Sequence, residues 1–215
     1  MTIKETRLFF TPRGEEAIKL EGILHHPGSK DLPAAIICHP HSLYGGSMDV
    51  PLVARIAQTL AEHGIVAFRF NFRGVGRSEG DFGEGVGELN DVAGAVDFLL
   101  GEEGVDEERL YLVGYSFGAW VGLRHAERDA RIQGVVAIGL PMWRLEDNFL
   151  SGYTEPKLFI AGEHDSICPL DMLRRFVEGL PFPKEVRILR SADHFFMGRE
   201  EEVAEAVADF ICQGS

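Results

Sequence analysis

The chain has 215 residues, of which 45% are hydrophobic, and a formal net charge of -13 at pH 7. A chain of this length can bury about 70 per cent of its unfolded surface in one domain, so its fold needs neither a disulfide nor a metal ion. Because polyanions are bound through Lys and Arg, the acidic balance argues against nucleic acid and anionic membranes as partners.

The first predicted elements form an antiparallel edge of a sheet. Apolar and polar residues alternate over residues 7–11 and 17–25, on either side of a Pro-Arg-Gly turn. This alternation predicts two antiparallel strands. Residues 27–33 are predicted to form a loop.

Beyond this loop, short apolar runs alternate with segments whose apolar residues recur at helical spacing. The runs predict strands at residues 34–38, 65–72, 109–115, 132–140, 157–162 and 185–189. The helical patterns predict helices at residues 53–60, with a stop at 63–64, and at residues 89–99, 117–128, 169–177 and 200–211. We therefore expect an α/β fold, with a mostly parallel sheet and helices on both faces.

Residues 142–155 show no clear period and are too few for a helical cap domain. We expect them to be an irregular segment near the site. The sequence thus predicts a single domain over residues 1–215 with no cap and an open, shallow site.

Two serines lie in the pattern G-x-S-x-G, which can form the sharp turn that presents a nucleophile. Ser116 directly follows the apolar run at 110–113, whereas Ser78 lies in a polar, glycine-rich stretch with no strand directly before it. Small residues on both sides of such a serine avoid collisions in a strained turn. Only Ser116 has the strand-turn-helix setting.

Two further reactive residues follow strands of the predicted sheet. Asp165 ends one strand and His194 follows the last strand, and sites in such sheets form beyond the carboxyl ends of the strands. A serine hydroxyl becomes a nucleophile when an imidazole takes its proton and a carboxylate orients that imidazole. Ser116, Asp165 and His194 supply these three roles, with Asp193 as a rival for the acid.

Five segments carry a family resemblance: HPHSLYGGSMD at 39–49, RFNFRGVGRSEG at 69–80, GYSFG at 114–118, GEHD at 162–165 and DHFF at 193–196. In these the chain resembles the α/β-hydrolases, specifically the small cap-less kind related to dienelactone hydrolases and bacterial esterase-like proteins. The resemblance implies acyl-transfer hydrolysis with Ser116 as nucleophile, Asp165 as acid and His194 as base. Dienelactone hydrolases proper use a cysteine nucleophile, so their substrate is not carried over.

Acyl transfer also needs two backbone N–H groups directed at the carbonyl oxygen as it becomes negative. One is expected from Phe117, immediately after the nucleophile. The other is expected from the loop after residues 34–38, where Pro40 has no N–H to donate. His41 is the first candidate for the second donor, and Ser42 is the next.

Other readings of the polar residues remain open. His39 is expected to be a hydrogen-bonded structural residue, although His39 and His41 with Glu163 or His164 could form a metal site that their spacing supports only weakly. Residues 74–80 read G-x-G-x-x-x-G, one residue off the dinucleotide fingerprint, and are predicted to be a turn. No cofactor and no metal ion are expected.

Several apolar residues in predicted loops near the site are candidates for a substrate pocket. Tyr44, Trp143 and Phe195 are the predicted substrate-binding residues. The others, which could equally belong to the core, are Phe149, Phe196 and Met197.

The cellular setting is predicted from the cysteines and the N-terminus. Cys38, Cys168 and Cys212 are few, far apart and odd in number, which indicates free thiols in a reducing compartment. The N-terminus lacks the apolar stretch of a secretory signal, and no apolar run approaches about 18 residues. We expect a cytoplasmic monomer or homodimer.

The function predicted from these residues is a serine hydrolase that cleaves small carboxylic esters. A thioesterase or a peptidase would use the same three side chains. A non-catalytic binding protein on a hydrolase scaffold is the alternative from another class, because a fold alone does not establish a function.

Overall fold

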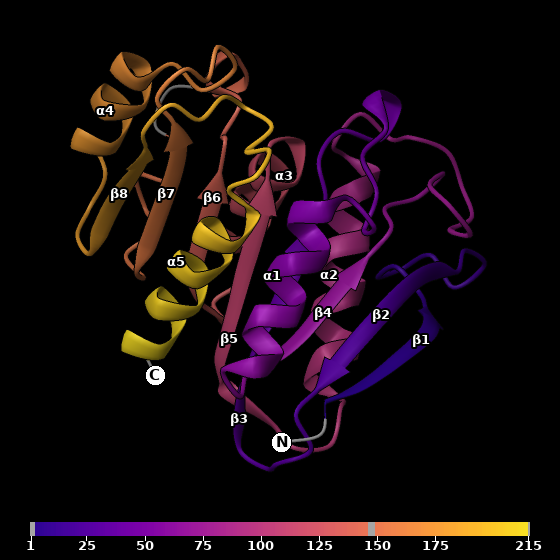
Figure 1. Cartoon of the computed structure of the whole chain (residues 1–215). Coiled ribbons are helices and arrows are strands. Elements are labelled where there is room, and N and C mark those ends of the chain that lie inside the picture. Colours follow the sequence, from indigo (N-terminus) through magenta and orange to yellow (C-terminus); the bar gives the residue numbers. More distant parts are fainter. Residues whose placement is uncertain (1–2, 146–148, 215) are drawn as a thin grey trace.

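The computed structural model describes residues 3–145 and 149–214. In these residues eight strands form one sheet: β1 (Lys4–Phe10), β2 (Leu20–His26), β3 (Leu32–Cys38), β4 (Val66–Phe70), β5 (Val105–Tyr115), β6 (Ile132–Ile138), β7 (Lys157–Gly162) and β8 (Lys184–Leu189). Their spatial order is β1-β2-β4-β3-β5-β6-β7-β8 (Figure 1). β2 pairs antiparallel with β1 and β4, and the remaining pairs are parallel. The predicted mostly parallel sheet with an antiparallel edge is confirmed.

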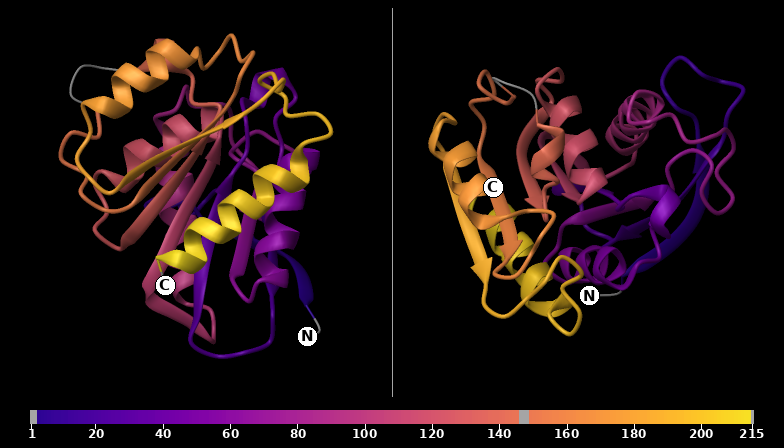
Figure 2. Two further views of the ribbon diagram at one scale, coloured as in Figure 1. Left: turned by 60° about the vertical axis from the view of Figure 1, so that its left-hand side comes forward. Right: turned by 90° about the horizontal axis from the view of Figure 1, so that it is seen from above.

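Helices cover both faces of the sheet, as predicted (Figure 2). α1 (Pro51–Glu62) and α5 (Glu200–Gln213) pack on one face, and their apolar side chains share a core cluster with the sheet. α2 (Gly87–Leu100), α3 (Phe117–Ala126) and α4 (Leu170–Glu178) contribute to the cluster on the other face. The sheet is thus the middle layer of three.

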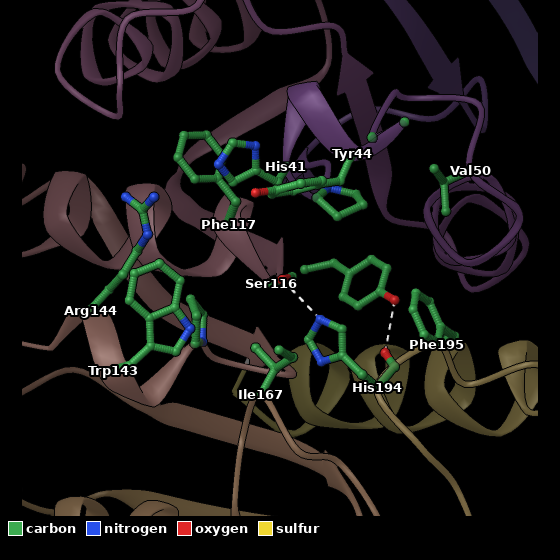
Figure 3. Close-up of a pocket in the computed structure, with 15 residues that line it drawn as sticks. His41, Tyr44, Val50, Ser116, Phe117, Trp143, Arg144, Ile167, His194 and Phe195 are labelled. Carbon is green, nitrogen blue, oxygen red and sulfur yellow. Dashed lines mark hydrogen bonds between the residues drawn. The ribbon is translucent and has the colours of Figure 1, made fainter.

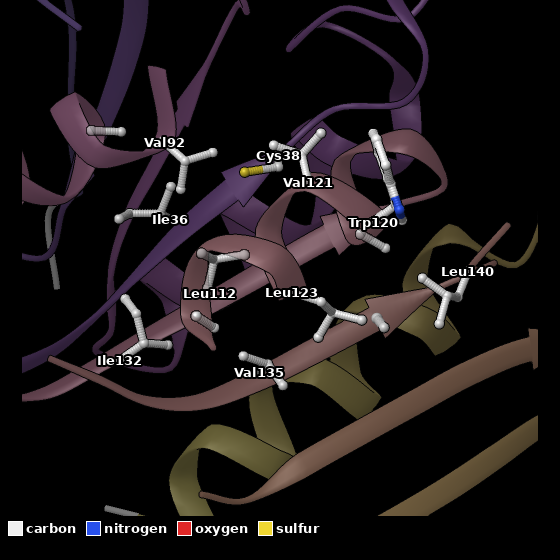
Figure 4. Close-up of a cluster of buried hydrophobic side chains, with 14 of the residues drawn as sticks. Ile36, Cys38, Val92, Leu112, Trp120, Val121, Leu123, Ile132, Val135 and Leu140 are labelled. Carbon is white, nitrogen blue, oxygen red and sulfur yellow. The ribbon is translucent and has the colours of Figure 1, made fainter. Parts of the chain in front are cut away.

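β5 lies at the centre of the sheet, and its apolar residues account for its position. Leu112 of β5 is buried together with Ile36 of β3 and Val135 of β6, beneath Val92 of α2 and Val121 of α3 (Figure 4). Burying each such side chain stabilises the fold by about 1.5–3 kcal/mol. This packing holds in place the strand that leads into Ser116.

Two predicted loop residues belong to a strand instead. β3 begins at Leu32, so Leu32 and Pro33 are not part of the predicted loop. The Leu32 N–H donates to the Gly104 carbonyl, and the register with β5 shifts between Leu32 and Ala34. A proline is tolerated there because the first residues of a strand and irregular positions can lack a ladder hydrogen bond.

Two other strand boundaries differ from the prediction because the chain turns there. β2 begins at Leu20 rather than at residue 17, since the Ile18 N–H closes a turn onto the Glu15 carbonyl. β6 ends at Ile138 rather than at residue 140, because Gly139 turns the chain with φ 56°.

The segment between β6 and β7 has no cap in its described part. It contains the 3-10 turn η2 (Met142–Arg144), and residues 146–148 of the predicted irregular segment lie outside the described residues. Cys38, Cys168 and Cys212 are free, as expected. Over the described ranges, no helix combines the length and the apolar character that crossing a membrane requires.

Candidate active site

Ser116 occupies a strained turn between β5 and α3. Its backbone has φ 54° and ψ -115°, a conformation that non-glycine residues rarely adopt. A Cβ at Gly114 would lie 2.4 Å from Ala119 Cα, and one at Gly118 would lie 2.3 Å from the Cys38 carbonyl oxygen. The two glycines are therefore required by close packing, and the turn projects Ser116 beyond the sheet.

The other serine in a G-x-S-x-G pattern is enclosed by the fold. The Ser78 hydroxyl donates to the Asn71 carbonyl at 2.7 Å and accepts from the Glu21 N–H at 2.9 Å. The Glu21 carboxylate accepts from the Arg77 N–H and from Asn71 Nδ2, both at 3.0 Å. This second motif forms a structural turn that ties residues 71–78 to β2.

The structure brings the three predicted catalytic side chains together from the ends of three strands. His194 Nε2 lies 3.0 Å from Ser116 Oγ, and His194 Nδ1 lies 2.8 Å from Asp165 Oδ2. Asp165 is buried, and its Oδ1 accepts from the N–H groups of Ile167 and Cys168, each at 2.8 Å. These hydrogen bonds fix the carboxylate and, through it, the orientation of the imidazole.

Asp193, the rival for the acid, lies elsewhere. Its Oδ1 accepts from the Phe195 N–H at 2.9 Å, which is a local turn contact on the exposed side of the loop. The carboxylate beside His194 therefore belongs to Asp165.

Gly139 and Tyr115 support this arrangement, and sequence reasoning missed both. A Cβ at Gly139 would lie 3.0 Å from His194 Cε1 and 3.3 Å from Asp165 Oδ2, so only glycine leaves room for the pair. The Tyr115 hydroxyl donates to the His194 carbonyl at 2.8 Å. Burial raises the pKa of Tyr115, which keeps its phenol protonated as the donor. The sequence did contain a signal for Gly139: it is a glycine at the end of the strand that lies next to β5.

The backbone N–H groups of the predicted oxyanion donors lie beside the site without an acceptor among the described residues. Phe117 is the first residue of α3, and His41 precedes η1 (Ser42–Tyr44). Neither N–H, nor that of Ser42, donates to an acceptor within residues 3–145 and 149–214. The Phe117 and His41 rings have centroids 4.8 Å apart, so the two predicted oxyanion donors belong to neighbouring residues, and Ser42 stays an alternative for the second.

The loop that carries His41 is held by tight backbone contacts. The His41 carbonyl accepts from the N–H groups of Tyr44 and Gly46, and a Cβ at Gly46 would lie 2.0 Å from the Pro40 carbonyl oxygen. Burial, together with the charge of Arg144, lowers the pKa of His41. His41 is therefore neutral near pH 7.

His39 is buried, and both of its ring nitrogens have partners. Nε2 accepts from the Phe72 N–H at 3.0 Å, and Nδ1 donates to the Pro40 carbonyl at 2.6 Å. Burial lowers the pKa of His39 to about 4. The ring thus joins the end of β3 to the end of β4. The described part of the chain contains no group of three or more His, Cys, Asp or Glu side chains arranged to hold a metal ion.

A pocket of about 470 Å³ opens beside Ser116 (Figure 3). Tyr44, Trp143 and Phe195 line it and are 87%, 66% and 65% exposed. Of the other candidates, Phe196 is fully buried, Phe149 packs against Phe176 of α4, and Met197 is exposed without lining the pocket. Sequence reasoning missed several further lining residues, among them Val50, Arg144 and Ile167.

Comparisons with known proteins identify the family of this fold. A family model described as an alpha/beta hydrolase domain matches residues 35–211. The chain belongs to the alpha/beta hydrolase family. An uncharacterized protein of Rickettsia prowazekii is 33% identical over 201 residues, which cover 90% of this alpha/beta hydrolase and 84% of the relative.

Solved structures extend the likeness of this alpha/beta hydrolase. A protein of unknown function from Agrobacterium tumefaciens has a TM-score of 0.87 at 32% identity, covering 97% of this chain and 95% of that one. A serine hydrolase without lid from Xanthomonas campestris has a TM-score of 0.82 at 28% identity, covering 99% and 96%. A serine hydrolase homologue from Coxiella burnetii has a TM-score of 0.83 at 29% identity, covering 95% and 96%. The expected cap-less alpha/beta hydrolase fold is confirmed.

Proposed function

We propose that this alpha/beta hydrolase cleaves small carboxylic esters through an acyl-enzyme formed on Ser116. The observation that carries the proposal is the chain of contacts from Ser116 Oγ to His194 Nε2 at 3.0 Å and from His194 Nδ1 to Asp165 Oδ2 at 2.8 Å. Such contacts activate a hydroxyl near neutral pH. The similarity to serine hydrolases of Xanthomonas and Coxiella supports the same chemistry.

In the proposed reaction, Ser116 Oγ attacks the ester carbonyl carbon while its proton passes to His194 Nε2. The N–H groups of Phe117 and His41 stabilise the negative oxygen. Each such donor lowers the barrier by about 2.7–4 kcal/mol. The bond to the alcohol oxygen then breaks as His194 returns the proton to it. A water molecule, deprotonated by His194, then attacks the carbonyl carbon of the acyl-enzyme. The bond to Ser116 Oγ breaks as His194 returns the proton to that oxygen, and the carboxylic acid is released. Asp165 stabilises the imidazolium in both halves of the reaction.

Replacement of the nucleophile tests this proposal. For Ser116→Ala we expect kcat on 4-nitrophenyl butyrate to fall by roughly 10⁶-fold, to the residual level that substrate binding and the two N–H donors support. A fluorophosphonate probe is expected to label the wild-type protein and not this variant. Undiminished hydrolysis by Ser116→Ala, or a folded wild type that the probe leaves unlabelled, would contradict the proposal.

Ser78→Ala is the matched control, because Ser78 stands in the same pattern. It loses two buried hydrogen bonds, so its free energy of unfolding should fall by about 1–3 kcal/mol. The folded variant should still be labelled at Ser116.

The type of acyl bond is tested by matched substrates. The same acyl group presented as an ester, a thioester and an amide should be turned over fastest as the ester. If the thioester or the amide is turned over faster than the ester, the proposed substrate changes to that acyl bond. The proposed roles of Ser116, His194 and Asp165 stay the same. Binding without turnover of any of the three would favour the non-catalytic alternative.

A further inference from the structure

One charged side chain of the pocket has no part in the proposed reaction. The Arg144 guanidinium carbon lies 4.7 Å from the ring centroid of Trp120, 4.7 Å from that of Trp143 and 5.7 Å from that of Phe117. Ring faces attract a guanidinium and hold its plane, but they accept none of its five N–H bonds. Arg144 makes no hydrogen bond or ion pair with another residue that the structure describes.

The position of Arg144 is set by the site itself. Its segment η2 follows β6, and the Met142 N–H donates to the carbonyl of Ile167, two residues after Asp165. The segment that contains Arg144 is therefore hydrogen-bonded to the segment that contains Asp165. The Arg144 side chain lines the pocket.

The charge of this pocket is opposite to that of the whole chain. The protein carries a net charge of -13, yet no Asp or Glu is among the described residues that line the pocket. Asp165 lies behind His194, with its oxygens bound to His194, Ile167 and Cys168. An anion inside the pocket would thus meet a guanidinium that is paired with no carboxylate of the described residues, within apolar walls where charge pairs are stronger than in water.

The pocket has two sides around Ser116. Figure 3 shows Arg144 and Trp143 on one side of the serine, and Val50 and Phe195 on the other. The His194 and Phe195 rings have centroids 5.9 Å apart. Because His194 returns the proton to the leaving alcohol, the alcohol belongs on the Phe195 side. The acyl chain then extends toward Arg144.

We propose that Arg144 selects esters whose acyl group ends in a carboxylate, that is, monoesters of dicarboxylic acids. The inference rests on the proposed ester hydrolysis at Ser116 and specifies its substrate class. The N–H edges of the guanidinium, which no described residue accepts from, match the two oxygens of a carboxylate in a bidentate pair.

The test compares monoethyl adipate with the ethyl ester of adipic monoamide, a neutral substrate of the same shape. For the wild type we expect kcat/KM to be at least roughly tenfold higher on the acid, the effect of a charge-assisted pair. In Arg144→Gln this ratio should fall to near one. The ratio for Arg144→Lys should lie between those of the wild type and Arg144→Gln, because lysine keeps the positive charge but lacks the paired N–H donors of a guanidinium.

Arg124→Gln is the matched control. The Arg124 guanidinium also stacks on Trp120, at 4.8 Å, but does not line the pocket. Its substitution should leave the acid-to-amide ratio at the wild-type value. A ratio near one in the wild type, or an unchanged ratio in Arg144→Gln, would overturn the inference.

A binding measurement separates this inference from the proposed function. Calorimetry with Ser116→Ala should detect adipate binding that is weakened at least roughly tenfold by the added Arg144→Gln substitution. Labelling of Ser116 with equal turnover of both esters would overturn the substrate class and keep the hydrolase. A wild type that is unlabelled and inactive on both esters would overturn the hydrolase itself.

Discussion

The Tyr115 hydroxyl donates a 2.8 Å hydrogen bond to the carbonyl oxygen of His194, so the residue before the proposed nucleophile holds the backbone of the proposed base. The Tyr115 ring also lies 5.7 Å from the His194 ring and 6.1 Å from that of Phe196, centroid to centroid. Tyr115 and His194 are 79 positions apart in the sequence. Their hydrogen bond joins the two segments that set the distance between Ser116 and His194.

Tyr115→Phe removes this hydrogen bond and keeps the ring. We expect kcat on 4-nitrophenyl butyrate to fall roughly tenfold with little change in KM, because His194 loses orientation while the pocket stays intact. The free energy of unfolding should fall by about 1 kcal/mol. Steady-state kinetics and urea denaturation measure the two effects. Tyr111→Phe, on the same strand but away from the pocket, is the control, and an equal kinetic effect there would argue against a positioning role.

Gly139→Ala should lower activity by crowding the side chains of His194 and Asp165. The added Cβ would lie 3.0 Å from His194 Cε1, and φ 56° is unfavourable for alanine. We expect the folded variant to lose at least roughly tenfold in kcat, measured together with fluorophosphonate labelling. Gly152→Ala should be tolerated, since a Cβ there meets nothing within 4 Å. Normal activity in Gly139→Ala would show that the His194 loop adapts.

The two candidate acids can be separated by amide substitutions. Asp165→Asn should lower kcat by roughly 10⁴-fold, because the imidazolium loses its buried counter-charge. Asp193→Asn should remain close to wild type, since an amide oxygen can still accept from the Phe195 N–H. Parallel pH-rate profiles would check both variants. The reverse order of effects would move the acid to Asp193.

Stability should depend on pH through His39. Its pKa is lowered from 6.5 to about 4 in the folded chain, so between these values the unfolded chain binds more protons. The free energy of unfolding should therefore fall as pH drops from about 6.5 to 4, by up to about 3 kcal/mol from this group. His39→Gln, which cannot titrate, should show a shallower decline in urea titrations at several pH values. Identical slopes would contradict this origin.

The sequence predicted those parts of the fold that depend on local pattern. The apolar run before Ser116 and the glycines around it determine a strand and a turn within a few residues. The early start of β5 at Val105 could not be predicted, because residues 106–109 of the strand are polar and partly or fully exposed. The start of β3 could not be predicted because Pro33 locally favours a loop, whereas here it lies at the register shift between Leu32 and Ala34.

The site shows the same division between local and distant effects. Ser116, Asp165 and His194 could be predicted because each follows a strand end, where a parallel sheet gathers side chains. Tyr115 and Arg144 could not, because their roles arise from packing against His194 and Trp120, segments that no local pattern brings near. Val50 and Ile167 likewise reach the pocket only through the fold.

The exposed rings of Tyr44, Trp143 and Phe195 at the mouth of the pocket have a thermodynamic consequence. In the absence of substrate they are in contact with water. A ligand that covers them removes apolar surface from water, and this gives binding a negative change in heat capacity. The enthalpy of association should therefore become steadily more favourable as the temperature rises, a behaviour that calorimetry with the inactive Ser116→Ala chain can follow directly.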